Sequence, residues 1–307
     1  MIDLNGLQPI LTEEQLVRFR ADGVLHLPGL IPESVYGPVR DDLAALIEAA
    51  KDGPAPDYTY LYHAPQRAGG TSTLYRINEL IGRHDLESVK LLLAYPPLLT
   101  AVYQAMGGKH FASTAAAAVF KLPYSQAAVG WHQDSNVLYR WPVFDTDIYL
   151  DHSDSDSGCL WAIPGSHLGG FPGRTKSREM IASFTGGRQG GDVPGAVPVV
   201  ARPGDVNLHS ASVIHGSFRS SSDRQRRIVY LHWDNHDDLA LKPVEQRHRK
   251  LYLWAQNLLR DSIELRKQRN PPEEPFPYET IDPTLLPGST DRYFSFTQYR
   301  GDDHLLD

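Results

Sequence analysis

The spacing of hydrophobic residues divides the chain into helical ends and a central stretch of short strands. In the N-terminal part, hydrophobic positions recur every three to four residues, which predicts amphipathic helices. Thr12 and Gln15 form a capping box in front of the first helix, and Gly23 ends that helix. The predicted elements of this part are helices at about 13–22, 33–47 and 76–106, with a short strand at 24–27.

From residue 111 onward, hydrophobic and polar residues alternate, which is the period of a β-strand. The polar, glycine-rich residues 168–193 interrupt this pattern and predict an insertion loop. The predicted strands are residues 115–121, 129–139, 147–152, 158–164, 197–202, 206–209, 213–215 and 227–233. Several short strands separated by regular turn signals are typical of a β-sandwich or a barrel.

The segments on either side of this central stretch contain further elements. Residues 51–73 predict either a lid loop or a half-exposed strand with its tyrosines on one side. After residue 240 a helical period returns, followed by a proline-rich coil at 271–287 and a possible last strand at 293–296. Because no clean boundary is visible, we predict one domain, divided into an N-terminal helical part (1–110), a barrel core (about 111–235) and a C-terminal helical extension (236–307).

Composition and charge narrow the classes of protein to consider. The contents of 41% hydrophobic and 22% charged residues are ordinary for a soluble globular protein. The net charge of −7, without a basic patch, argues against a nucleic-acid partner. Cys159 is the single cysteine, which excludes an intrachain disulfide, and its apolar neighbours favour a buried residue over a nucleophile. Because the chain shows neither a signal-peptide pattern nor a long apolar run, we expect a cytoplasmic protein without a membrane partner.

The candidate chemistry centres on a His-x-Asp pair in residues 130–136. Alternate side chains of a strand share one face, so His132 and Asp134 are expected to point the same way. One imidazole and one carboxylate are two of the three ligands of non-haem Fe(II) oxygenases, whose triad leaves positions open for a co-substrate and dioxygen. The chain contains four such pairs, namely His132/Asp134, His152/Asp154, His232/Asp234 and His236/Asp238.

The positions of other residues select among these pairs. The third ligand should be a histidine on a later strand, followed by a cation that can hold a dicarboxylate, and His215 fits this description. Arg226 follows eleven residues later, and its planar guanidinium can pair with a carboxylate through two hydrogen bonds. Ser217 can add a hydroxyl donor. The pair at His232 and Asp234 lies beyond Arg226, so no later histidine and arginine complete it.

We interpret the other histidines of interest as residues with structural roles and not as metal ligands. His152 and Asp154 belong to an acidic stretch that is typical of a solvated loop. His167 lies in a Pro-Gly-Ser-His turn, where it is expected to hold the loop by hydrogen bonds. His209 lacks a carboxylate partner at the right offset, so we interpret it as a residue of the core or of the pocket wall.

The order of the motifs resembles one known family. The pattern consists of the first helix with residues 22–24 behind it, Lys121-Leu122-Pro123, residues 131–134, residues 158–167, His215-Gly216-Ser217 and Arg226-Arg227. In this combination the chain resembles the phytanoyl-CoA dioxygenase family of Fe(II)/2-oxoglutarate-dependent oxygenases. The resemblance covers roughly residues 10–235.

The resemblance implies a fold and a set of site residues. The fold is mainly β with flanking α, built on a double-stranded β-helix (jelly-roll, cupin-like) core. The implied iron ligands are His132, Asp134 and His215, and the implied partners of the 2-oxoglutarate C5 carboxylate are Arg226 and Ser217. Arg227 is the rival of Arg226, because adjacent strand residues face opposite ways, and the spacing favours Arg226. Lys121 is a further candidate for the co-substrate pocket, and Tyr124 and Gln133 are pocket candidates that the sequence does not rank.

The implied function is that of an Fe(II)/2-oxoglutarate-dependent dioxygenase, which uses O2 to oxidise an unactivated C–H bond and releases succinate and CO2. Related halogenases lack the carboxylate ligand, so Asp134 argues against halogenation. The same triad serves hydroxylation, desaturation, epimerisation, ring closure and endoperoxide formation, and these remain open. We expect residues 51–73, the insertion at 168–193 and the extension beyond 240 to be lid elements, and their aromatic residues favour a small-molecule, secondary-metabolite substrate. The alternatives are an acyl or amino-acid-like hydroxylase of the same family, a non-redox cupin-like metal-binding protein and, more remotely, a zinc hydrolase.

Overall fold

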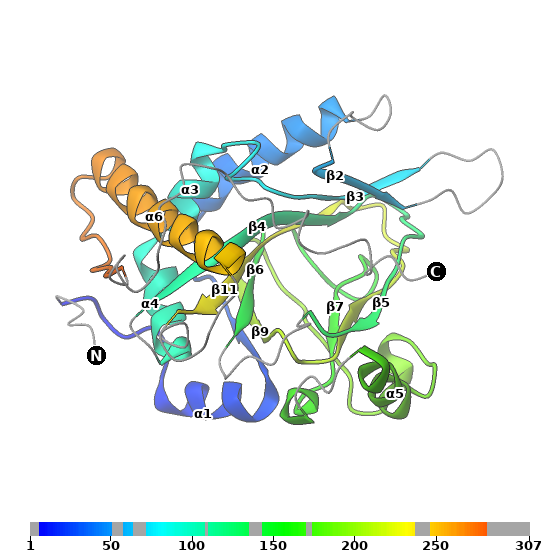
Figure 1. Ribbon diagram of the computed structural model, residues 1–307. Helices are drawn as coiled ribbons and strands as arrows, with labels where there is room; N and C mark the ends of the chain where they lie inside the picture. Colours follow the sequence, from blue (N-terminus) through cyan, green and yellow to red (C-terminus); the bar gives the residue numbers. More distant parts are fainter. Residues whose placement is uncertain are drawn as a thin grey trace.

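Two antiparallel sheets form the centre of the protein in a computed structural model (Figure 1). The structure describes residues 6–50, 58–63, 72–107, 110–134, 143–169, 174–236 and 246–280. Within these ranges the large sheet has seven strands and the small sheet has four. Their arrangement is the double-stranded β-helix, or jelly-roll, that the sequence predicts, with helices on the flanks.

The strand order brings distant parts of the chain side by side. The large sheet contains, in order, β1 (Val24–Leu27), β9 (Val206–Ser210), β6 (Phe144–Tyr149), β11 (Arg226–Asn235), β4 (Phe111–Lys121), β3 (Thr73–Ile77) and β2 (Tyr60–His63). The small sheet contains β5 (Val129–His132), β10 (His215–Ser217), β7 (Leu160–Ala162) and β8 (Val197–Pro198). Consequently, side chains from β6, β9 and β11 lie next to one another although long stretches of sequence separate them.

Helices cover the outer face of the large sheet. The described residues contain α1 (Glu13–Asp22), α2 (Glu33–Ala49), α3 (Glu87–Leu93), α4 (Pro96–Met106), α5 (Arg174–Thr185) and α6 (Gln246–Arg269), with short 3₁₀ helices η1 (Ser166–Gly169) and η2 (Gly190–Asp192). Figure 1 shows α6 along β4, whereas α5 lies near β5 of the small sheet. No helix among the described residues is long and apolar enough to cross a membrane.

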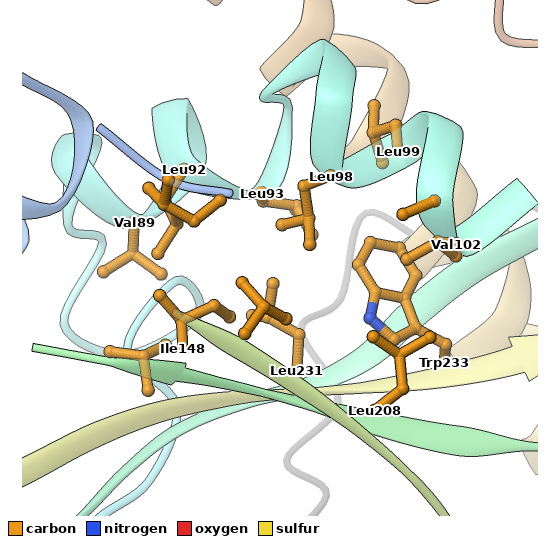
Figure 2. Close-up of a cluster of buried hydrophobic side chains, with 14 of the residues drawn as sticks. Val89, Leu92, Leu93, Leu98, Leu99, Val102, Ile148, Leu208, Leu231 and Trp233 are labelled. Atoms are coloured by element: carbon orange, nitrogen blue, oxygen red, sulfur yellow. The ribbon is translucent and has the colours of Figure 1, made fainter. Parts of the chain in front are cut away.

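The helix-facing side of the large sheet carries the main hydrophobic core. Figure 2 shows side chains of α3 and α4 packed above the sheet, with Leu98 above Leu231 and Val102 beside Trp233. Alternate residues of a strand point to opposite faces, so His232 and Asp234 point away from the helices. Burial of the hydrophobic face therefore orients the polar side chains of β11 toward the interior of the barrel.

Local sequence signals set the ends of the first helix, as predicted. The Thr12 hydroxyl accepts a hydrogen bond from the backbone N–H of Gln15 (3.2 Å), and the Gln15 side chain accepts one from the backbone of Thr12 (2.9 Å). Gly23 then adopts a left-handed conformation with φ of 75°, which ends the helix. The strand predicted after it is β1.

The prediction that residues 168–193 form a loop is wrong, because this segment contains α5. Met180 and Ile181 of α5 pack against Ile163 and Ile214, which lie in a small hydrophobic cluster beside the small sheet. The helix is mostly polar, so its own hydrophobic period is weak. Contacts with residues distant in sequence stabilise it instead.

The prediction of one helix over 76–106 is also wrong. Strand β3 continues to Ile77, and the helical region begins only at Glu87. Pro96 starts a second helix, because proline has no N–H for a helix interior but fits the first turn. In the preceding segment 51–73, the strand interpretation holds for the described part, since β2 pairs with β3.

Some predicted features fall on residues that the structure does not describe. The possible strand at 293–296 and the end of the predicted strand at 129–139 lie outside the described ranges. Asp238, the partner in one of the four His-x-Asp pairs, lies outside them as well.

Candidate metal centre and co-substrate pocket

His132, Asp134 and His215 come together at adjacent strands of the small sheet. β5 and β10 pair antiparallel with His132 directly opposite His215, and their imidazole centroids are 4.2 Å apart. The Asp134 carboxylate lies 3.4 Å from Nε2 of His132 and 3.3 Å from Nε2 of His215. One ligand atom from each residue falls within 4.8 Å of the other two, so the three side chains could hold one metal ion.

The two imidazoles are oriented by backbone carbonyls. Nδ1–H of His132 donates to the carbonyl oxygen of Gly130 (2.8 Å), and Nδ1–H of His215 donates to that of Val213 (3.0 Å). Because a carbonyl only accepts, each Nδ1 carries the proton and each Nε2 presents a lone pair to the cluster. This is the orientation that metal-binding histidines adopt when an outer partner fixes their tautomer.

The charge states also suit a metal centre. Burial, followed by the nearby His132, lowers the pKa of His215, which favours the neutral imidazole that binds metals. Burial acts to raise the pKa of Asp134, but the neighbouring imidazoles, His215 foremost, hold it well below its usual value. Two neutral imidazoles and one carboxylate are the donor set of the iron triad. The side chains of His132 and Asp134 are 28% and 18% exposed, so the cluster is accessible.

Two of the other His-x-Asp pairs occupy different places. His152 lies 3.3 Å from Asp154 in a partly exposed loop, where Asp154 also binds Arg224. His232 and Asp234 are buried on the inner face of β11, where Nε2 of His232 lies 3.8 Å from Oδ1 of Asp234. Neither pair joins the cluster at His215.

A buried cation lies at the start of β11. The Arg226 side chain is almost fully buried, and one of its terminal N–H groups donates to the Ser217 hydroxyl (3.2 Å). That hydroxyl in turn donates to the carbonyl oxygen of Gly158 (3.0 Å). Among the described residues, however, nothing accepts a hydrogen bond from Nε of Arg226. A buried guanidinium with a free N–H is costly unless an acceptor arrives from outside the chain.

Tyr149 provides a second unpaired donor beside this arginine. It lies on β6 opposite Ile228 of β11, at the same end of the sheet as Arg226. Its hydroxyl is buried and has no hydrogen-bond partner among the described residues. Burial, followed by the charge of Asp147, raises its pKa well above the usual value, so the hydroxyl keeps its proton and remains a donor. Two unpaired donors at one place fit an incoming carboxylate.

Arg227, the rival of Arg226, is already engaged on the opposite face. Its guanidinium makes two hydrogen bonds to Asp151, at 2.8 and 2.9 Å, and a third to the backbone carbonyl of Arg40. This difference follows from the alternation of side chains along β11. Arg226 therefore lies on the inner face of β11, and Arg227 lies on the outer face.

Lys121 is a second buried basic residue beside Arg226. It lies directly opposite Arg226 in the β4–β11 pair, and its Nζ donates to the backbone carbonyls of Ala127 and Ser217. One of the three ammonium protons is left for another acceptor. Burial, followed by the charge of Arg226, lowers the pKa of Lys121 to about 7. A bound anion would relieve both effects, because a negative charge favours the charged form of Lys121.

The contact of His209 with the candidate metal centre was not predicted from the sequence. His209 was expected in the core or pocket wall for want of a carboxylate, yet its Nε2 lies 3.3 Å from Asp134 and its Nδ1 lies 2.9 Å from Asp147. Burial acts to lower the pKa of His209, but Asp147 and the other neighbouring carboxylates raise it well above its usual value. The one sequence signal for this wall is the alternation of Asp145, Asp147 and Tyr149 along β6.

The other candidates have structural roles or lie elsewhere. Nε2–H of His167 donates to the carbonyl oxygen of Arg20 (3.0 Å), which ties its turn to α1 as predicted. Cys159 is buried, and burial raises the pKa of its thiol to about 11, which disfavours the reactive thiolate. Tyr124 is 62% exposed, and Gln133 is buried with its amide donating to the carbonyl oxygen of Ser212.

A jelly-roll of two antiparallel sheets with a His-Asp-His cluster and a buried arginine is the architecture of non-haem iron oxygenases. The family model described as "Phytanoyl-CoA dioxygenase (PhyH)" matches residues 19–228, more than half of the chain. The chain therefore belongs to the phytanoyl-CoA dioxygenase family, and it is an oxidoreductase of the dioxygenase class. This confirms the family resemblance noted in the sequence.

Named relatives and solved structures agree with this assignment. The chain is 27% identical to "Phytanoyl-CoA dioxygenase 1" of Oryza sativa subsp. japonica, over 72% of this chain and 88% of the rice protein. It superimposes on AviO1 from Streptomyces viridochromogenes with a TM-score of 0.62 and 26% identity, over 75% of this chain and 97% of AviO1.

A more distant structure shares the fold. The epimerase SnoN, whose crystal structure is a complex with Fe3+, alpha ketoglutarate and nogalamycin RO, has 19% identity and a TM-score of 0.54. The likeness covers 73% of this chain and 83% of SnoN. At this identity the comparison supports the jelly-roll fold.

Proposed function

We propose that the protein is an Fe(II)/2-oxoglutarate-dependent dioxygenase that oxidises an unactivated C–H bond of a small molecule. The observation that carries the proposal is the buried pair of unsatisfied donors, Nε of Arg226 and the Tyr149 hydroxyl, on the inner face of a barrel that also holds the His-Asp-His cluster. A structural arginine would have its donors paired within the chain, as those of Arg227 are.

The proposed ligands of iron are His132, Asp134 and His215. The two backbone carbonyls at Gly130 and Val213 hold the imidazoles so that both Nε2 atoms face the metal position. Bound there, Fe(II) would supply the activation of O2 coupled to decarboxylation of 2-oxoglutarate to succinate and CO2.

The proposed partners of the 2-oxoglutarate C5 carboxylate are Arg226, Lys121 and Tyr149. Ser217, which was expected from the sequence to bind the carboxylate directly, donates its one proton to Gly158 and acts through Arg226 instead. Arg226 and Lys121 provide charge in a dry pocket, where a salt bridge to a carboxylate is strong because solvent does not screen it. The Ser217 hydroxyl holds Arg226 in place. Tyr149 donates the hydrogen bond for which the chain offers no acceptor among its described residues.

For the substrate, we propose tailoring of a secondary metabolite. SnoN, which comes from nogalamycin biosynthesis and shares the fold, supports this proposal. The Asp134 ligand favours oxygenation or a related oxidation over halogenation. Hydroxylation of an acyl or amino-acid-like substrate is the alternative, and product analysis with candidate substrates would separate the two.

The test is an anaerobic titration of the Fe(II)-loaded protein with 2-oxoglutarate, following the weak visible charge-transfer band of the metal chelate. We expect the band in the wild type, and we expect Arg226→Ala to require far more 2-oxoglutarate or to lose the band. Arg227→Ala is the matched control, because it removes the neighbouring guanidinium that binds Asp151 on the other face. If the wild type binds iron but shows no band, the dioxygenase proposal fails, and a non-redox cupin-like metal-binding protein becomes the better interpretation.

A further inference from the structure

His209 directs one nitrogen at the carboxylate of the candidate metal centre. It lies on β9 of the large sheet, whereas Asp134 follows β5 of the small sheet. The distance from Nε2 of His209 to Oδ2 of Asp134 is 3.3 Å, and the His209 side chain is 5% exposed. The imidazole centroids of His209 and His215 are 4.6 Å apart, so His209 stands directly behind the cluster.

On the inner face of the large sheet, Asp147 holds this imidazole and Asn207 in turn holds Asp147. Nδ1 of His209 lies 2.9 Å from Oδ2 of Asp147, and the Asn207 amide donates to the same oxygen (3.0 Å). Asp147 pairs with Asn207 in the β6–β9 register, and Asp145 pairs with His209. A carboxylate only accepts hydrogen bonds, so both ring nitrogens of His209 act as donors between Asp147 and Asp134.

The carboxylate of Asp145 also lies near Nε2 of His209, but it is less well placed to accept a hydrogen bond from it. Oδ2 of Asp145 lies 3.6 Å from Nε2 of His209, beyond hydrogen-bond distance, whereas Oδ2 of Asp134 lies within it. Oδ1 of Asp145 instead lies 2.8 Å from Nδ1 of His232. The hydrogen bond of His209 is therefore directed at the metal centre.

We propose that His209, held by Asp147, is a positioning residue that binds one oxygen of Asp134 and keeps this carboxylate a one-oxygen ligand of the metal. The inference rests on the proposed function. In a six-coordinate centre, two imidazoles and one carboxylate oxygen leave three positions, which a bidentate co-substrate and dioxygen require. A carboxylate that turned both oxygens to the metal would take one of those positions. His209 binds Oδ2, which also lies 3.3 Å from Nε2 of His215, so its N–H competes with the metal for this oxygen and leaves Oδ1, 3.4 Å from Nε2 of His132, as the single metal ligand.

The experiment compares two substitutions at one position. His209→Leu removes both N–H donors at similar volume, whereas His209→Gln keeps an N–H donor near the place of Nε2. Each variant is titrated anaerobically with Fe(II) alone, and then with 2-oxoglutarate after iron loading. For His209→Leu we expect Fe(II) affinity to fall roughly 10- to 100-fold, as for other outer-sphere partners of metal ligands. We also expect weaker 2-oxoglutarate binding and a shifted charge-transfer band, and we expect His209→Gln to recover most of both.

A buried histidine elsewhere on the same face controls for general loss of packing. His232 is as buried as His209 and binds Asp145. If His232→Leu and His209→Leu weaken Fe(II) binding equally, or if folded His209→Leu binds Fe(II) and 2-oxoglutarate like the wild type, the positioning role is refuted. If His209→Leu loses its cooperative thermal transition, Asp147→Asn decides instead. This variant keeps an acceptor but removes its charge, and we expect Fe(II) affinity to fall roughly threefold or more; an unchanged affinity overturns the inference.

These outcomes are separable from failure of the proposed function. The titration with Fe(II) alone tests the hydrogen bond from His209 to Asp134 without any co-substrate. A wild type that binds iron but forms no 2-oxoglutarate chelate would refute the dioxygenase proposal, while the ratio of Fe(II) affinities would still decide the role of His209.

Discussion

The Tyr149 hydroxyl offers a test in which stability and co-substrate affinity should change in opposite directions. Tyr149→Phe removes one oxygen atom from a fully buried side chain and leaves the ring in place. Without co-substrate, this hydroxyl has no hydrogen-bond partner among the described residues. A buried polar group without a partner costs about 1–3 kcal/mol, so its removal should leave the free energy of unfolding unchanged or raise it by about 1 kcal/mol.

With co-substrate, the same substitution should be harmful. A hydrogen bond from the Tyr149 hydroxyl to a carboxylate contributes about 1.5–3 kcal/mol, which corresponds to roughly a 10- to 100-fold loss of 2-oxoglutarate affinity. The assays are urea denaturation without 2-oxoglutarate and the anaerobic chelate titration with it. Fe(II) affinity should remain at the wild-type value, because Tyr149 is not part of the metal cluster.

A second tyrosine provides the matched control. The Tyr278 hydroxyl donates to the backbone carbonyl of Phe111 (2.5 Å), on the outer side of the large sheet. Tyr278→Phe should therefore lower the free energy of unfolding and leave 2-oxoglutarate affinity unchanged. If Tyr149→Phe behaves like this control, its hydroxyl does not bind the co-substrate and the reasoning is refuted.

Two further predictions concern Lys121 and Gly23. The pKa of Lys121 is lowered to about 7, and a bound carboxylate favours the charged form of its amine. The affinity for 2-oxoglutarate should therefore fall as pH rises through 7. In the chelate titration, Lys121→Met should flatten this pH profile. Since the unfolded chain keeps this proton up to about pH 10.5, the free energy of unfolding should rise with pH between 7 and 10.5 in the wild type only. Gly23→Ala should lower the free energy of unfolding in urea by at least ~1 kcal/mol, because φ is 75° and a Cβ would lie 2.5 Å from Nδ1 of His167. Gly29→Ala, with φ of 62° and open space around it, should cost less, and equal losses would contradict the steric explanation.

Local chemistry explains what could be predicted from the sequence. The capping box at Thr12 and the left-handed Gly23 depend on residues within one helical turn, so they are legible in the chain itself. The same holds for the alternation along β11, which separates Arg226 from Arg227 because neighbouring side chains of a strand face opposite ways. The order of His132, His215 and Arg226 along the chain pointed to one family, and the family match confirms that assignment.

Only the tertiary structure decided which distant residues support the candidate site. His209 meets Asp147 and Asp134 across 62 and 75 residues of sequence, because β9 pairs with β6 and the inner face of the large sheet stands behind the small sheet. Tyr149 reaches the side of Arg226 through the β6–β11 register. A sequence shows which side chains share a face of one strand, but the pairing of strands sets their neighbours. That pairing depends on burying the hydrophobic face of the whole sheet against the helices.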